Sequence, residues 1–351
     1  MQPSSGRVGC HVTSLLQLKN LDEGPGKTLL DATQAIGFSR EVARTGLLAE
    51  FDAWEQPGAM EALSRRIELL DVEACPKNVL LIAAGTLPVS TLRHVLFARS
   101  LGANVLLKCA TGQEWVGDAI GQVDPGVRAT PFSRDDVGAL RGAIDQVDTV
   151  VALGSDESLD DIKGHVPFHK TFVGYGHRIS AAWVSSPTEA HLQGLAEDLL
   201  MWDQAGCLSP QVLWTHESPT EVANALAKRI EHIEHRFPRV LSPWAARERH
   251  ASVAFGHMRG QVSQTDTSTL IALSESSFRP SPRHRLLWVL PANEDALQAV
   301  VPQLSTLALQ GSLGIDLPPH VRVCEPGSMQ RPSLEWKQDG EDPLTALLRS
   351  S

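Results

Sequence analysis

Strand-like and helix-like patterns alternate through the middle of the chain. An apolar run over residues 77–84 predicts a strand, and a helix follows whose apolar face consists of Leu92, Val95, Leu96 and Leu101. Gly102 stands where a helix commonly ends, because glycine accepts the left-handed conformation found there. Val105–Leu107 predicts a second strand. A strand, a helix and a strand in this order are typical of a parallel sheet with right-handed crossovers.

The alternation continues to residue 175. Val127–Pro131 predicts a strand and Asp135–Ile144 a helix, and two further strands are predicted over Thr149–Leu153 and Thr171–Tyr175. Before residue 76 the apolar positions have loosely helical spacing, as in Ile36, Val42, Leu47, Leu48, Phe51 and Leu63. We therefore expect a helical amino-terminal region over 1–75 and an α/β domain over 76–198.

The pattern starts again near residue 198. Ser218-Pro219-Thr220-Glu221 has the form of a helix start, with serine as the cap and proline at the first helical position. A helical stripe follows, made of Val222, Leu226, Ile230, Ile233 and Phe237. Leu286–Leu290 then predicts a strand and Glu294–Val301 a helix. A second α/β domain is expected over 199–320, with a tail over 321–351 that wraps the surface.

Composition narrows the class of protein. A chain of 351 residues favours two domains, and its 42% apolar and 21% charged residues are ordinary for a globular protein. The net charge of −10 argues against a nucleic-acid partner. No apolar stretch approaches the ~20 residues of a membrane helix, and the first residues do not resemble a signal peptide. These features predict a cytoplasmic protein without an integral membrane segment.

Two groups of residues only superficially resemble functional motifs. Gly24-Pro25-Gly26-Lys27-Thr28 is similar to the end of a P-loop, but Leu21 stands where that motif requires glycine and no strand precedes it, so a polar turn is predicted. Glu231, His232, Glu234 and His235 fall on the solvent side of the 222–237 stripe, which favours a charged face over a metal site. The five cysteines are dispersed without a C-x-x-C pair, which argues against a disulfide framework and a zinc ribbon.

Two loops carry candidate chemistry. Gly154-Ser155-Asp156-Glu157 closes a predicted strand and starts a helix, whose free N–H groups suit a pyrophosphate; the acidic residues alone also favour a helix start, and no G-x-G-x-x-G is present. Cys207 follows 53 residues beyond Gly154, beside Gly206 and the polar Asp203 and Gln204. This setting favours a reactive thiolate, with an inert buried thiol as the alternative. Together the loops suggest a nucleotide cofactor brought to a thiol nucleophile.

The order of motifs resembles the aldehyde dehydrogenase superfamily and, within it, the long-chain acyl-CoA reductases of bacterial bioluminescence type. The likeness runs from about residue 36 to the carboxyl terminus and includes a strand over Gln211–Trp214, a helix over 219–236 and a closing segment from Trp336 to Gly340. Its five motifs are Ala84-Gly85-Thr86-Leu87-Pro88, Leu107-Lys108-Cys109-Ala110-Thr111, Gly154-Ser155-Asp156-Glu157, Gly174-Tyr175-Gly176-His177-Arg178 and Gln204-Ala205-Gly206-Cys207. The resemblance implies an α/β, aldehyde dehydrogenase-like fold, with a parallel-sheet cofactor-binding domain and an α/β catalytic domain.

The resemblance also implies roles for individual residues. Cys207 matches the acyl-accepting nucleophile, Gly154 and Ser155 the start of the helix that holds the cofactor pyrophosphate, and Lys108 the lysine that contacts the adenosine ribose. Thr111 stands where NAD-preferring members carry a glutamate that binds the ribose hydroxyls. Because this negative charge is missing, a 2′-phosphate has room, so NADPH is the expected cofactor and NADH the alternative.

Two positions depart from the family pattern. Gly174 replaces the glutamate with which hydrolytic members activate water, so an acyl-enzyme would persist until a hydride reduces it. Thr86 replaces the asparagine that donates to the oxyanion, and loss of one such donor costs on the order of a hundredfold in rate. The implied activity is NADPH-dependent reduction of a fatty acyl thioester, on coenzyme A or an acyl-carrier protein, to the aldehyde through an acyl-cysteine.

Two alternatives remain open at this point. Thr86, together with a chain that is short for the family, is compatible with an impaired homologue that serves as a binding subunit of a lipid-modifying complex. The other alternative is acyl transfer or thioester hydrolysis without reduction. Acyl-transfer partner proteins and a homo-oligomer are compatible with the sequence, which leaves acyl chain length, carrier and oligomeric state open.

Overall fold

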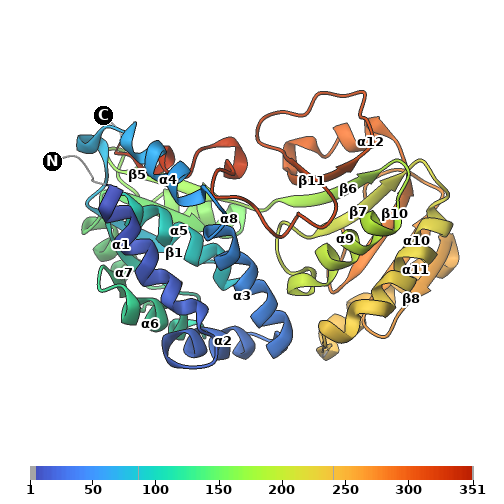
Figure 1. Cartoon of the computed structure of the whole chain (residues 1–351), viewed down its shortest axis with the longest axis horizontal. Coiled ribbons are helices and arrows are strands. Elements are labelled where there is room, and N and C mark those ends of the chain that lie inside the picture. The colour runs from blue at the N-terminus through green and yellow to red at the C-terminus, as the bar shows by residue number, and fades with distance from the viewer. Residues whose placement is uncertain (1–4, 86, 240, 350–351) are drawn as a thin grey trace. The chain divides into compact units, whose positions relative to one another are not determined.

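The structure is a computed structural model that describes residues 5–85, 87–239 and 241–349 (Figure 1). These residues form two compact units. Within the described ranges, the first unit takes the residues up to Arg40, Gly46–His177 and those from Ser333 onward, and the second takes Glu41–Thr45 and Arg178–Pro332. None of the helices in these ranges combines the length and the apolar character needed to cross a membrane.

Helices form the amino-terminal region, as the sequence predicts. They are α1 (Ser5–Leu16), η1 (Gln17–Lys19), α2 (Gly24–Ala35), α3 (Arg40–Trp54), α4 (Ala59–Glu68) and η2 (Val72–Ala74). The segment similar to a P-loop starts α2, so the predicted polar turn is wrong. Pro25 lies in the first turn of this helix, and Lys27 forms an ion pair with Asp31 one turn later. Gly26 permits close packing, because a Cβ there would lie 2.1 Å from the carbonyl oxygen of Asn20.

A parallel sheet organises the first unit. Its strands are β1 (Asn78–Ile82), β2 (Asn104–Lys108), β3 (Val127–Ala129), β4 (Thr149–Leu153) and β5 (Thr171–Tyr175), in the order β3-β2-β1-β4-β5. The helices between them are α5 (Pro88–Ser100), α6 (Glu114–Val123), α7 (Val137–Asp145) and α8 (Asp156–Lys163) (Figure 1). All neighbouring strands pair in parallel. The predicted strands are confirmed, with shifts of a few residues at some ends.

One apolar core lies between strands of this sheet and the helix α7. Leu80 and Ile82 of β1, with Val150 of β4, belong to one core that also includes Leu140 and Ile144 of α7.

The helix α5 differs from its prediction, because it is buried almost all around rather than on one apolar face, and its polar residues Arg93 and His94 are buried as well. Gly102 has φ 83° just after this helix, which confirms the predicted terminating glycine.

A second sheet organises the other unit. Its order is β12-β11-β6-β7-β10-β9-β8, with strands β6 (Ile179–Val184), β7 (Pro210–Thr215), β8 (Gly260–Gln264), β9 (Thr269–Leu273), β10 (Leu286–Pro291), β11 (Leu304–Gln310) and β12 (Arg322–Cys324). The helices are α9 (Glu189–Leu200), α10 (Pro219–Ile233), α11 (Pro243–Arg259) and α12 (Glu294–Gln298). All strand pairs are parallel except β8 with β9. Because β6 pairs with β7 and β11, the division between the units falls before Arg178, earlier than the predicted boundary at 198.

The helix α10 largely confirms its prediction. The Ser218 hydroxyl accepts from the Glu221 N–H at its start, and its predicted apolar stripe is buried. The prediction that Glu234 lies on the solvent side is wrong, because this residue is only 9% exposed. Its carboxylate accepts from the hydroxyls of Thr265 and Thr267 at 2.8 and 2.6 Å. Among the described residues no group of three His, Cys, Asp or Glu side chains is arranged to hold a metal ion.

The carboxyl-terminal segment divides between the two units, which corrects the single predicted tail over 321–351. Up to Pro332 it belongs to the second unit, where the buried carboxylate of Asp198 accepts from the N–H groups of Gly327 and Met329 at 2.6 and 3.0 Å. From Ser333 onward it lies along the first unit. Side-chain hydroxyls of β4 and β5 donate to it there, from Thr149 to Leu347 and from Thr171 to Leu348, both at 2.9 Å.

Candidate active site

The carboxyl ends of β1, β2 and β4 bring most of the predicted cofactor residues to one edge of the first sheet. The chain order reverses between β1 and β4, and ligands of open parallel sheets bind at such a switch point. Lys108 ends β2 and Thr111 follows it, while Gly154 and Ser155 follow β4. The loop after β1 ends at this edge too, but Thr86 lies outside the described residues.

The loops after β1 and β2 are fixed against each other. The buried amide of Gln113 donates to the Gly85 carbonyl at 2.5 Å, and a Cβ on Gly85 would lie 3.3 Å from that of Ala110. Beside this contact Thr111 is exposed, and the Lys108 ammonium lies 5.8 Å from the centroid of the Phe132 ring. Gln113 was missed by the sequence analysis, since only the fold shows that its partner lies in the preceding loop.

The start of α8 is open to solvent. Ser155 is exposed and caps the helix by accepting from the Ser158 N–H at 3.3 Å. The Gly154 N–H donates to the Tyr175 carbonyl at 3.2 Å, which joins this loop to the end of β5. The helix dipole here favours an anion, whereas Asp156 and Glu157 in the first turn oppose it by charge. These residues fit a dinucleotide pyrophosphate bound at the helix start.

The end of β5 is built around glycines. A Cβ on Gly174 would lie 3.0 Å from Phe172 Cε1 and 3.4 Å from Leu159 Cδ1, so a side chain there requires the phenyl ring to move. At Gly176 a Cβ would lie 2.3 Å from Asp156 Oδ1, whose carboxylate accepts from the His177 N–H at 3.0 Å. Gly174 itself is exposed, so its close contacts are confined to the side chains of Phe172 and Leu159.

Cys207 lies in the second unit, in the loop that enters β7. Its thiol is in no disulfide, the residue is partly exposed, and its carbonyl accepts from the buried Ser180 hydroxyl at 2.6 Å. Burial disfavours the thiolate form of the three other cysteines whose side chains are described. Burial raises the pKa of Cys75, and it raises those of Cys109 and Cys324 to about 11, which leaves these thiols protonated at neutral pH.

The residues before Cys207 are buried rather than exposed beside the thiol. Asp203 forms an ion pair with the fully buried Arg285, which also donates to the Thr267 hydroxyl at 2.9 Å. Burial raises the pKa of the Asp203 carboxyl, and the guanidinium opposes that rise. The polar neighbours Asp203 and Gln204 are therefore buried in the second unit and bond to its interior. They do not form the solvent-facing surroundings of the Cys207 thiol.

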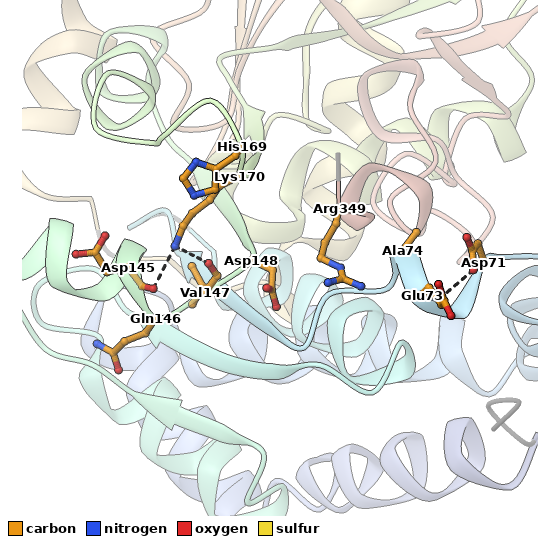
Figure 2. Close-up of a pocket in the computed structure, with 10 residues that line it drawn as sticks. All are labelled: Asp71, Glu73, Ala74, Asp145, Gln146, Val147, Asp148, His169, Lys170 and Arg349. Atoms are coloured by element: carbon orange, nitrogen blue, oxygen red, sulfur yellow. Dashed lines mark hydrogen bonds between the residues drawn. The ribbon is translucent and has the colours of Figure 1, made fainter. Parts of the chain in front are cut away.

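A polar pocket of about 640 Å³ lies at the opposite end of the first sheet from the predicted cofactor residues (Figure 2). Its lining includes Asp148 and Lys170, which precede β4 and β5. The Lys170 ammonium donates to the carbonyls of Ile144, Asp145 and Val147 at 2.6, 3.1 and 2.8 Å and so caps the end of α7. None of the predicted site residues lines this pocket, and Lys170, one of its two cations with Arg349, is already used to hold the end of α7.

Comparison with known protein families gives one broad match. The sequence model described as acyl-CoA reductase (LuxC) matches residues 118–350. Among curated proteins, the chain is similar to the long-chain acyl-protein thioester reductase of Aliivibrio fischeri, with 24% identity over 183 residues. That alignment covers 48% of this chain and 38% of the relative, so the chain aligns with well under half of the relative's length.

Solved structures with a similar fold include aldehyde dehydrogenases. The enzyme KauB of Pseudomonas aeruginosa has a TM-score of 0.71 and 13% identity over 96% of this chain and 78% of its own. Aldehyde dehydrogenase 21 of Physcomitrella patens, in complex with succinate, has a TM-score of 0.69 and 12% identity, and the match covers 98% of this chain and 84% of that one. An NAD-dependent aldehyde dehydrogenase of Sinorhizobium meliloti has a TM-score of 0.64 and 15% identity, and the match covers 88% of this chain and 70% of that one. The predicted aldehyde dehydrogenase-like fold is confirmed.

Proposed function

The chain belongs to the acyl-CoA reductase (LuxC) family of oxidoreductases, and we propose that it reduces a fatty acyl thioester to the fatty aldehyde, with Cys207 as the acyl acceptor and NADPH as the cofactor. The observation that carries this proposal is the position of Cys207, which is partly exposed and in no disulfide, on a loop of an aldehyde dehydrogenase-like fold. The similarity to an acyl-protein thioester reductase supports a thioester as the substrate.

Cys207 performs the first step. Its thiolate attacks the carbonyl carbon of the acyl thioester, a bond forms from sulfur to that carbon, and the carrier thiolate leaves and takes a proton. The product is a new thioester on Cys207 of similar energy, so the exchange needs no ATP. The Cys207 N–H and the Thr86 hydroxyl are the proposed donors to the oxyanion. Since Gly174 offers no carboxylate to activate water, the acyl-enzyme persists for reduction.

The cofactor residues of the proposal lie in the first unit. Gly154 and Ser155 would hold the pyrophosphate at the start of α8, and Lys108 would contact the adenosine ribose. A bound nicotinamide supplies the hydride that reduces the acyl carbon. The resulting thiohemiacetal on Cys207 then collapses, which releases the aldehyde and restores the thiolate. The exposed Thr111 leaves room for a 2′-phosphate, so NADPH is proposed over NADH.

Thr111→Glu should reverse the cofactor preference. A carboxylate beside a 2′-phosphate repels it, so we expect kcat/KM with NADPH to fall about 100-fold while that with NADH changes little. Thr111→Gln is the matched control, because it adds the same bulk without the charge and should change both values little. Initial rates with each cofactor at fixed acyl-CoA measure the effect. An unchanged NADPH rate in Thr111→Glu would place the 2′-phosphate elsewhere.

The proposed activity is tested by following NADPH absorbance with acyl-CoA substrates of increasing chain length and, separately, with acyl-carrier protein. One aldehyde should form for each NADPH oxidised and each thiol released. Thiol release without NADPH oxidation would instead indicate acyl transfer or hydrolysis. Quenching of tryptophan fluorescence by NADPH without any turnover would indicate a binding subunit. Either result would overturn the proposed reductase activity.

A further inference from the structure

Two segments of the second unit with left-handed backbone angles bond to each other near Cys207. Trp202, Asp203 and Gln204 have φ values of 57°, 53° and 61°, and residues 283–285 have values of 65°, 60° and 60°. A left-handed conformation is unfavourable for an L-residue, so runs of three form only where the surroundings enforce them. Such strain commonly lies next to functional groups. Here the first run ends three residues before Cys207 and the second ends at β10.

The side chain of Gln204 joins these two segments. It is 0% exposed, and its amide nitrogen donates to the carbonyls of Pro210 and Leu286, both at 2.7 Å. Its amide oxygen accepts from the Leu286 N–H at 2.9 Å. Pro210 is the first residue of β7 and Leu286 the first of β10. The amide therefore ties the beginning of the Cys207 loop to the first residues of two neighbouring strands.

Three backbone carbonyls of the Cys207 loop also accept hydrogen bonds from other residues of the second unit. The Ala205 carbonyl accepts from Arg283 at 2.9 Å, that of Gly206 from the Ser209 N–H at 3.2 Å, and that of Cys207 from Ser180 at 2.6 Å. Three consecutive peptide planes are thus fixed by partners from three parts of the unit. The bonds of Gln204, together with the ion pair between Asp203 and Arg285, hold the left-handed run against the start of β10.

We propose that Gln204 is a positioning residue for Cys207, whose buried amide keeps the nucleophile loop in its strained conformation. The inference rests on the proposed role of Cys207. Loss of the amide frees the loop to relax toward ordinary backbone angles, which moves the sulfur relative to a bound acyl carbon. A displacement of about 1 Å at a reacting atom costs about 100-fold in rate.

The test compares Gln204→Met with Gln310→Met. Both replace an amide by an apolar chain of similar length, but Gln310 accepts from the Ser186 N–H at the carboxyl end of β11, away from the strand starts where Cys207 lies. We expect Gln204→Met to lower kcat about 100-fold with KM for acyl-CoA within about threefold, and Gln310→Met to leave both unchanged. Amide exchange of residues 205–209 should quicken at least tenfold in Gln204→Met alone.

Equal kcat values for wild type and Gln204→Met, or an equal fall in both variants, would overturn the proposal. If Gln204→Met does not fold, Arg283→Met releases the Ala205 carbonyl from a partly exposed position and should lower kcat about tenfold; an unchanged kcat there counts against it. Amide exchange separates this claim from the proposed function. Should Cys207→Ser retain activity, the role of Cys207 fails, whereas unchanged exchange in Gln204→Met defeats the positioning role alone.

Discussion

Replacing Cys207 with serine is expected to lower acyl-CoA reduction by at least about 10⁴-fold, because the acyl-enzyme cannot form without the thiolate. A serine hydroxyl is a far weaker nucleophile than a thiolate at neutral pH. Incorporation of radiolabelled acyl groups from acyl-CoA should disappear together with NADPH oxidation. Rapid-quench labelling and a steady-state assay measure the two effects.

Cys324→Ser is the matched control for this experiment. Cys324 lies in β12 of the same unit, forms no disulfide, and has a pKa that burial raises to about 11. Its replacement should leave both labelling and turnover unchanged. If Cys207→Ser still incorporated label, another residue would be the acyl acceptor. If it lost turnover but kept label, the thiol would act in the reduction step instead.

The sequence predicted the first sheet well because its signals are local. The strands over 149–153 and 171–175 were placed at their observed bounds, since each is a short apolar run followed by a polar or glycine-containing loop. The strand β6 was missed. Its residues include Ser180, Ala181 and Ala182, which give a weak apolar signal, yet the strand is wholly buried because β7 and β11 pair on either side of it. That burial is a property of the assembled sheet.

In the candidate site, too, local features could be predicted from the sequence and features that depend on distant residues could not. Ser155 could be assigned to a helix start because its cap bond reaches only to Ser158. The support of the Cys207 loop could not be predicted, since Gln204 bonds to Leu286 and Asp203 pairs with Arg285, both more than 80 residues later. The sequence analysis used Asp203 and Gln204 as signs of a polar setting. Their bonding to strand starts explains instead why this loop keeps an unfavourable backbone.

Arg93→Met should destabilise the first unit by about 3–5 kcal/mol, because it leaves a buried carboxylate without its cation. Arg93 and Glu50 are 6% and 8% exposed as side chains and form two parallel bonds, from Nε and Nη2, at 2.9 and 3.0 Å. Glu50 also accepts from the Trp54 indole N–H at 2.8 Å. The third nitrogen, Nη1, donates to the Ser333 carbonyl at 2.9 Å, so one guanidinium joins α5, α3 and the carboxyl-terminal segment.

Urea unfolding followed by tryptophan fluorescence measures the loss. Lys27→Met is the control, because it breaks an exposed pair within one helix and should cost no more than about 0.5 kcal/mol. Combining Arg93→Met with Glu50→Leu should recover part of the lost stability, since no charge then remains buried. A single Arg93→Met variant as stable as wild type would mean that water or another cation satisfies Glu50. In that case the bond from Arg93 to the Ser333 carbonyl would not be needed to hold the carboxyl-terminal segment against α5, the helix that follows the Thr86 loop.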